Sequence, residues 1–72
     1  MNDAQRKDMI ETAVEIVFTY PEWTCEHVNA YRKIFPYEAP YDVSELYDMC
    51  QEADEQKKMG NDYHTTIKNL LG

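Results

Sequence analysis

Apolar positions recur at helical spacing in four stretches of the chain, and no stretch alternates as a strand does. The first stretch covers about residues 3–19. Asn2, with Gln5 three residues later, predicts an N-terminal cap, and Pro21 predicts the end because the residue before a proline avoids the helical conformation. The apolar face is predicted to consist of Ile10, Ala13, Val14 and Val17, widened by Met9, Ile16 and Tyr20.

The second predicted helix begins at Pro21 or at Thr24 and ends near Phe35. Proline is favoured at a first helical position because it has no N–H group to satisfy there. Pro36 predicts the end of the helix, and the segment 36–41, with its two prolines, predicts a loop. The apolar face of this helix is predicted to consist of Val28, Tyr31, Ile34 and Phe35.

Two further helices are predicted in the second half of the chain. Asp42 and Glu45 predict a capping box at the start of the third helix, and Gly60 suits the position just after its end. A fourth helix, starting from Asn61 or Asp62, is too short to persist alone and must therefore dock. The predicted apolar positions are Val43, Leu46, Tyr47, Cys50 and Ala53 in the third helix, and Tyr63, Ile67, Leu70 and Leu71 in the fourth.

These patterns predict an all-α fold, a small bundle of three to four short helices that forms a single domain over residues 1–72. Short connections favour antiparallel neighbours. A core of this size supplies on the order of 3–5 kcal/mol of stability, so we expect help from a partner or from a homodimer. The chain starts at Met1, and we expect a complete short reading frame.

Charge is distributed unevenly along the chain. The net charge is −7, and residues 37–56 contain seven acidic side chains and no basic one. In this segment Asp54 has a lysine four residues away, whereas the acids opposite the apolar face of the third helix do not. Those acids form a predicted stripe about 15 Å long on the third helix: Glu45, Asp48, Glu52 and Glu55.

Two interpretations of the stripe remain open. It is either the solvated face of an amphipathic helix or a docking surface for a basic partner. The second interpretation is favoured by the absence of mixed charge, because ordinary solvated helices carry both signs. The basic surfaces of proteins that hold DNA or RNA are the obvious partners for such a stripe. Further partner-binding candidates are Glu38 and the aromatic residues Trp23, Tyr37 and Tyr41.

Other kinds of chemistry fit the sequence poorly. Cys25, His27, Cys50 and His64 have the residue types of a zinc site but not a standard spacing. The acidic segment lacks the central glycine of a calcium-binding loop, and no catalytic motif is present. A helix that reads DNA would present basic or amide side chains to the groove, whereas the third helix presents glutamates. We therefore expect no metal, no cofactor, no enzymatic activity and no direct contact with nucleic acid.

Cysteine content and hydropathy bear on location. A secreted chain this small would usually contain several disulfides, and Cys25 and Cys50 are better read as free thiols. The N-terminal residues are charged, and the densest apolar run, Ile16 to Phe18, is far too short for a bilayer. The sequence therefore predicts a cytoplasmic protein without a membrane segment.

The leading functional expectation is a small acidic protein-binding protein that inhibits its partner by covering a nucleic-acid-binding surface. In size and charge the chain resembles the short acidic inhibitors that phages and plasmids make against host defence, such as anti-CRISPR and anti-restriction proteins. The alternative is a regulatory or structural helical module that self-associates and has no nucleic-acid-related partner. A third reading is an antitoxin or a transcription accessory protein with a basic partner.

Overall fold

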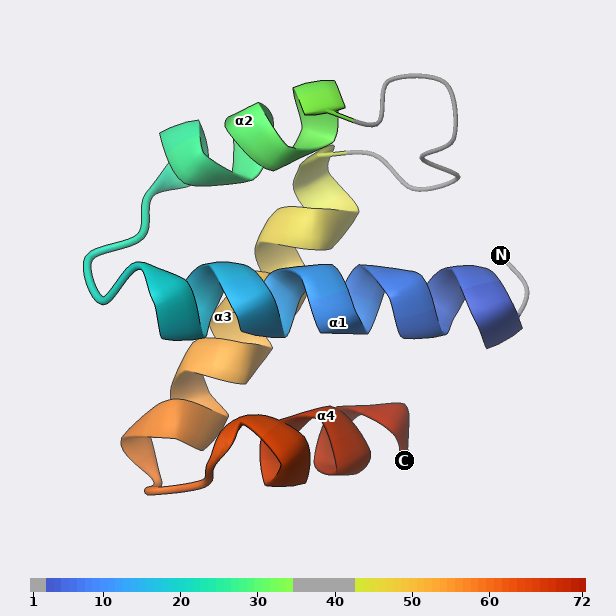
Figure 1. The fold of residues 1–72 in the computed structure, drawn as a ribbon, viewed down its shortest axis with the longest axis vertical. Coiled ribbons are helices and arrows are strands. Elements are labelled where there is room, and N and C mark those ends of the chain that lie inside the picture. The colour runs from blue at the N-terminus through green and yellow to red at the C-terminus, as the bar shows by residue number, and fades with distance from the viewer. Residues whose placement is uncertain (1–2, 35–42) are drawn as a thin grey trace.

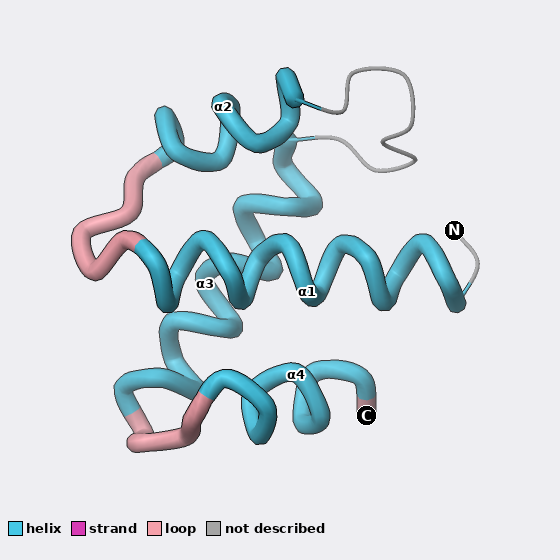
Figure 2. Tube along the Cα trace, viewed as in Figure 1, coloured by secondary structure: helices cyan, strands magenta, loops and turns pink. Residues whose placement is uncertain are grey.

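The computed structural model describes residues 3–34 and 43–72, and the side chains of residues 32–34 also lie outside that description. These two ranges contain helices and no strand, which confirms the all-α prediction (Figure 2). The predicted caps Asn2 and Asp42, the end of the second helix at Phe35 and the loop 36–41 lie outside the described residues. The helices are α1 (Asp3–Thr19), α2 (Cys25–Ile34), α3 (Val43–Lys58) and α4 (Tyr63–Leu71).

Helix α1 is the centre of the fold and contacts the other three helices. In Figure 1, α2 and α4 lie on either side of α1 and run in the opposite direction, whereas α3 crosses behind it. The expectation of antiparallel neighbours therefore holds for α2 and α4 relative to α1 and is wrong for α3. The crossing leaves α3 with one face against α1 and the opposite face open.

The core forms where α1 and α3 cross. Ala13 of α1 and Ala53 of α3 are fully buried, and the Sγ atom of Cys50 lies 3.9 Å from the carbonyl oxygen of Ala13. Small side chains allow two helix backbones to approach closely, and they explain why α3 can cross α1 at a single tight contact. The buried core is made of Met9, Ile10, Ala13, Val14, Ile16, Val17, Val28, Leu46, Cys50 and Ala53.

Helix α2 begins after Thr24, the second of the two predicted starts. The hydroxyl of Thr24 accepts a hydrogen bond from the N–H of Glu26 at 3.3 Å, and the N–H of Thr24 donates to Nδ1 of His27 at 3.0 Å. This is a reciprocal capping box in which a histidine replaces the usual glutamate. Pro21 lies in the turn before the helix, so its placement at a first helical position is wrong.

The connection between α3 and α4 follows the predicted capping rules. Gly60 has a φ of 92°, and the N–H of Asn61 donates to the carbonyl of Gln56 at 3.1 Å, as in a Schellman motif. Asp62 caps α4 by accepting a hydrogen bond from the N–H of Thr65 at 2.7 Å. Both signals for this turn, the glycine and the aspartate, are thereby confirmed.

Helix α4 docks on α1, as its short length requires. The guanidinium group of Arg6 donates to the carbonyl oxygens of Leu70 at 2.9 Å and Leu71 at 3.1 Å, and so satisfies the end of α4. The prediction that Leu71 joins the core is wrong, because its side chain is 37% exposed. Thr66 is fully buried instead, and its hydroxyl has no hydrogen-bond partner among the described residues.

The two thiols are expected to differ strongly in reactivity. Cys25 is exposed, whereas Cys50 is buried and its burial raises the pKa of the thiol to about 12. A disulfide reagent should therefore modify Cys25 at once and Cys50 about a hundred-fold to several thousand-fold more slowly, because a stability of about 3–5 kcal/mol limits opening of the core. The absorbance of the thiol that the reagent releases gives the modification rates of both cysteines. The variant Cys25→Ser should lack the fast phase. Two equally fast phases would contradict the buried position of Cys50.

Candidate functional site

The acidic stripe (Glu45, Asp48, Glu52 and Glu55) lies along α3, and all four of its residues are exposed. The opposite side of the same helix contains the buried residues Leu46, Cys50 and Ala53. The helical spacing thus places the carboxylates as predicted, away from the core. One rigid helix holds them in a row about 15 Å long.

The two lysines at the end of α3 form their hydrogen bond and ion pair outside the acidic stripe, although Lys58 also attracts the carboxylate of Glu55. Lys57 donates from Nζ to the carbonyl oxygen of Val17 at 3.2 Å, and the same atom lies 5.5 Å from the centre of the Phe18 ring. It therefore closes the C-terminal end of α1, where a positive charge is favourable. Lys58 forms an ion pair with Asp54 at 2.9 Å, which is the pairing predicted from the i, i+4 spacing.

Trp23 packs against α3 from the connection between α1 and α2. Its ring centre lies 5.5 Å from that of Tyr47 in an edge-to-face arrangement, and its Nε1–H group donates to Oδ1 of Asp54 at 3.4 Å. The side chain is only partly buried, so one part of the ring stays accessible. Trp23 is therefore held by α3 next to the acidic stripe.

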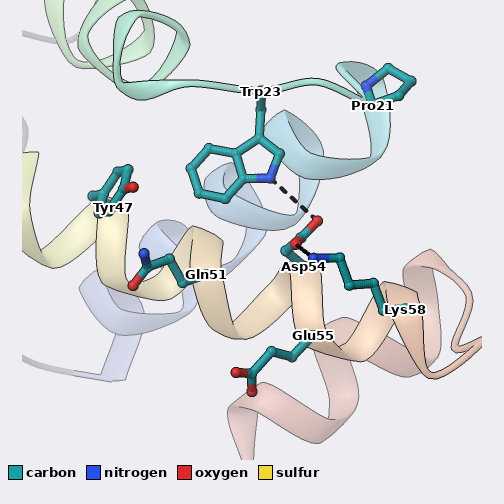
Figure 3. Close-up of a pocket in the computed structure, with 7 residues that line it drawn as sticks. All are labelled: Pro21, Trp23, Tyr47, Gln51, Asp54, Glu55 and Lys58. Atoms are coloured by element: carbon teal, nitrogen blue, oxygen red, sulfur yellow. Dashed lines mark hydrogen bonds and ion pairs between the residues drawn. The ribbon is translucent and has the colours of Figure 1, made fainter.

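An open hollow lies beside Trp23, on the surface of the adjacent part of α3 (Figure 3). It offers about 550 Å³ of space. Figure 3 shows the N–H edge of the indole pointing toward the carboxylate of Asp54. Gln51 lies between Tyr47 and Asp54 on the same helix, and the side chain of Glu55 extends away from the indole. We call this space the Trp23 hollow. It is lined by Pro21, by Trp23 and by the α3 residues Tyr47, Gln51, Asp54, Glu55 and Lys58.

A second, smaller hollow lies between the start of α2 and the start of α3. It offers about 280 Å³, and its walls include Cys25, Val43 and Asp48. Tyr47 lines both hollows. Because Asp48 borders the small hollow and Glu55 borders the Trp23 hollow, the acidic stripe and the hollows form one continuous surface.

Asp54 is a functional candidate that the sequence reasoning missed. The hydrogen bond from Lys58 holds the pKa of this carboxyl below its ordinary value, and the bond from the indole of Trp23 adds to the effect. Asp54 therefore stays ionised beside an aromatic ring. A signal was present in the sequence, because Asp54 follows Tyr47 by seven residues and so shares its face of α3.

Three of the predicted partner-binding residues, Tyr37, Glu38 and Tyr41, lie outside the described residues and stay predictions. Within residues 3–34 and 43–72, no group of three or more His, Cys, Asp or Glu side chains is arranged to hold a metal ion. No helix in the described part of the chain combines the length and the apolar composition that a bilayer crossing needs.

Comparisons with known proteins were made at three levels. No protein-family model, no curated protein sequence and no solved structure matches this chain.

Proposed function

We propose that this protein acts by binding another protein, and that the acidic stripe of α3 docks on a basic surface of that partner. In the specific form of the proposal, the surface is one that normally holds DNA or RNA, and its occupation inhibits the partner. The chain would then act like the phage or plasmid inhibitors of host defence, such as anti-CRISPR proteins. Catalysis, a cofactor and direct binding to nucleic acid form no part of the proposal.

The observation that carries the proposal is the way α3 uses its charges. Lys57 donates to Val17 of α1 and Lys58 forms its ion pair with Asp54, so the exposed acidic stripe keeps a net negative charge, although Lys58 also attracts the carboxylate of Glu55. Like charges three and four residues apart destabilise a helix by a few tenths of a kcal/mol per pair. A row of carboxylates on a rigid helix can replace phosphate groups on arginine and lysine side chains, and would speed association with such a surface.

Two groups that could serve in nucleophilic or acid–base chemistry, Cys50 and His27, are engaged within the fold, which supports binding rather than catalysis. Burial raises the pKa of the Cys50 thiol to about 12, so this group stays protonated and unreactive. His27 accepts the N–H of Thr24 through Nδ1 and packs its ring against Tyr20, with ring centres 4.5 Å apart. Both residues thus stabilise the fold.

Charge reversal within the acidic stripe tests the proposal. The variant Asp48→Lys with Glu52→Lys should lose partner binding by about 100-fold or more, because like charges across an interface cost several kcal/mol. The change lies on the exposed face, so the far-UV circular dichroism spectrum should stay helical. The partner is captured from cells that contain the wild-type chain, purified, and used in binding measurements at increasing salt and in competition with DNA and RNA.

The matched control is Glu15→Lys with Glu26→Lys. Both residues are exposed, they lie on α1 and α2, and the change in net charge is the same. The control variant should bind the partner within about three-fold of the wild type, since its charges lie outside the acidic stripe. Equal affinity of the stripe variant and the wild type, or a captured partner that still binds DNA and RNA when saturated with this chain, would overturn the proposal.

A further inference from the structure

The Trp23 hollow has two walls of different chemistry. One wall is aromatic, since the rings of Trp23 and Tyr47 lie edge to face with centres 5.5 Å apart. The other wall contains the carboxylate of Asp54, and Glu55 lines the hollow at its edge (Figure 3). A cation that enters this space can contact a ring face and a carboxylate at the same time, and the two interactions reinforce each other in a partly dehydrated site.

The hollow already contains a cation from its own chain. Nζ of Lys58 lies 2.9 Å from Oδ2 of Asp54, although the Lys58 side chain is 77% exposed. The side chain of Asp54 is only 23% exposed, but an ion pair whose cation is surrounded by solvent contributes little to stability. Lys58 can therefore leave Asp54 at small cost when a better donor arrives.

A guanidinium group fits this hollow better than an ammonium group does. The guanidinium plane stacks on aromatic rings and is more weakly hydrated, and its N–H groups bind a carboxylate in pairs. The long aliphatic stem of an arginine side chain would pack on the exposed part of the Trp23 ring. The ammonium of a lysine makes a single point contact with the same groups.

We infer that the Trp23 hollow receives one arginine side chain of the partner, which replaces Lys58 on Asp54 and stacks on Trp23. The inference rests on the proposed function and deepens it, because it names the residue type that the acidic surface recognises. The acidic stripe then supplies attraction at a distance, and the hollow supplies the preference for arginine over lysine.

Trp23 is the only tryptophan of the chain, so its single indole N–H resonance reports directly on the hollow. The probes are two capped peptides of equal length, one of alternating glycine and arginine and one of alternating glycine and lysine. The arginine peptide should shift the indole N–H resonance and bind about ten-fold more tightly than the lysine peptide. Asp54→Asn should remove that preference while the protein stays folded.

A substitution of Lys58 separates this inference from a general effect of charge. Lys58→Met should tighten binding of the arginine peptide about three-fold or more, because Asp54 is then free to accept the guanidinium. The matched control is Lys68→Met, which removes the same charge from an exposed lysine in the last turn of α4. Lys68→Met should change the affinity less than about two-fold.

Equal affinities for the two peptides with an unmoved indole resonance would overturn the inference, as would equal effects of Lys58→Met and Lys68→Met. The proposed function would survive that result if the stripe variant Asp48→Lys with Glu52→Lys still lost the partner. The opposite result is also informative. If the arginine peptide is still preferred and the stripe variant binds the partner normally, the proposed role of the stripe is overturned and the hollow remains as a separate site.

Discussion

Replacement of Leu46 by alanine is expected to unfold most of the protein at room temperature. Leu46 is 1% exposed and lies on the face of α3 that packs in the core. A buried Leu→Ala substitution costs about 2–5 kcal/mol, because apolar contacts are lost and a cavity remains. The total free energy of unfolding of a domain of this size is on the order of 3–5 kcal/mol. Urea denaturation followed by circular dichroism measures the loss.

Two variants keep this prediction testable if Leu46→Ala is fully unfolded. Leu46→Met preserves the side-chain volume and should cost less than about 1.5 kcal/mol. Met59→Ala removes an apolar side chain that is 70% exposed at the end of α3, and should change the free energy of unfolding by less than about 0.5 kcal/mol. A Leu46→Ala protein that unfolds at the same urea concentration as the wild type would contradict the described core.

The substitution Ala53→Asp is expected to have an effect at least as large. Ala53 is fully buried in the core cluster of α1 and α3. A carboxylate at this position would lose its hydration, and Lys57, four residues further on, already donates to the carbonyl oxygen of Val17. An uncompensated buried charge costs about 3–5 kcal/mol. The helical signal should be lost at neutral pH and should return in part as the pH falls, because protonation removes the charge.

The matched control for this charge is Gln51→Asp, which places an aspartate in the same helix at an exposed position. Gln51→Asp changes the net charge by the same amount and should cost less than about 1 kcal/mol. Thermal unfolding of the two variants at neutral pH makes the comparison. Similar melting temperatures for Ala53→Asp and Gln51→Asp would show that Ala53 is not buried as described.

Helix α3 contributes both to the stability of the fold and to the proposed binding surface. The same helix places Leu46, Cys50 and Ala53 in the core and holds the acidic stripe on its other side. Variants that unfold the core are therefore expected to lose partner binding as well, without any direct contact with the partner. This coupling is why the charge reversals and the lysine substitutions above use exposed positions, and why each of them has a charge-matched control elsewhere in the chain.

Helix boundaries were predictable wherever a local signal was strong. Gly60 and Asp62 marked the end of α3 and the start of α4, and the structure places both at their capping positions. The start of α2 was ambiguous because Pro21 and Thr24 both suit a helix start, and the hydrogen bonds of Thr24 resolved it. The exposed positions of the acidic stripe followed from helical periodicity alone.

Contacts between distant residues were beyond this kind of reasoning. The guanidinium of Arg6 in the first helix closes the end of α4 sixty-four and sixty-five residues away, a contact that no local pattern indicates. Lys57 lies in the last turn of α3, where a lysine commonly stabilises the end of its own helix, and it caps α1 instead. Thr66 replaced Leu71 in the core because the docking of α4 on α1, rather than the hydropathy of its residues, determines which side is buried.

Periodicity and capping act within a few residues, so the order of amino acids was sufficient for the four helices, the capped connection between α3 and α4, and the row of carboxylates along α3. The crossing of α3 over α1, the use of Lys57 away from the stripe and the hollow between Trp23 and Asp54 needed the folded chain. Each depends on side chains 31 or more residues apart that meet only when the core has packed. Packing is a property of all the helices together, and no single segment contains it.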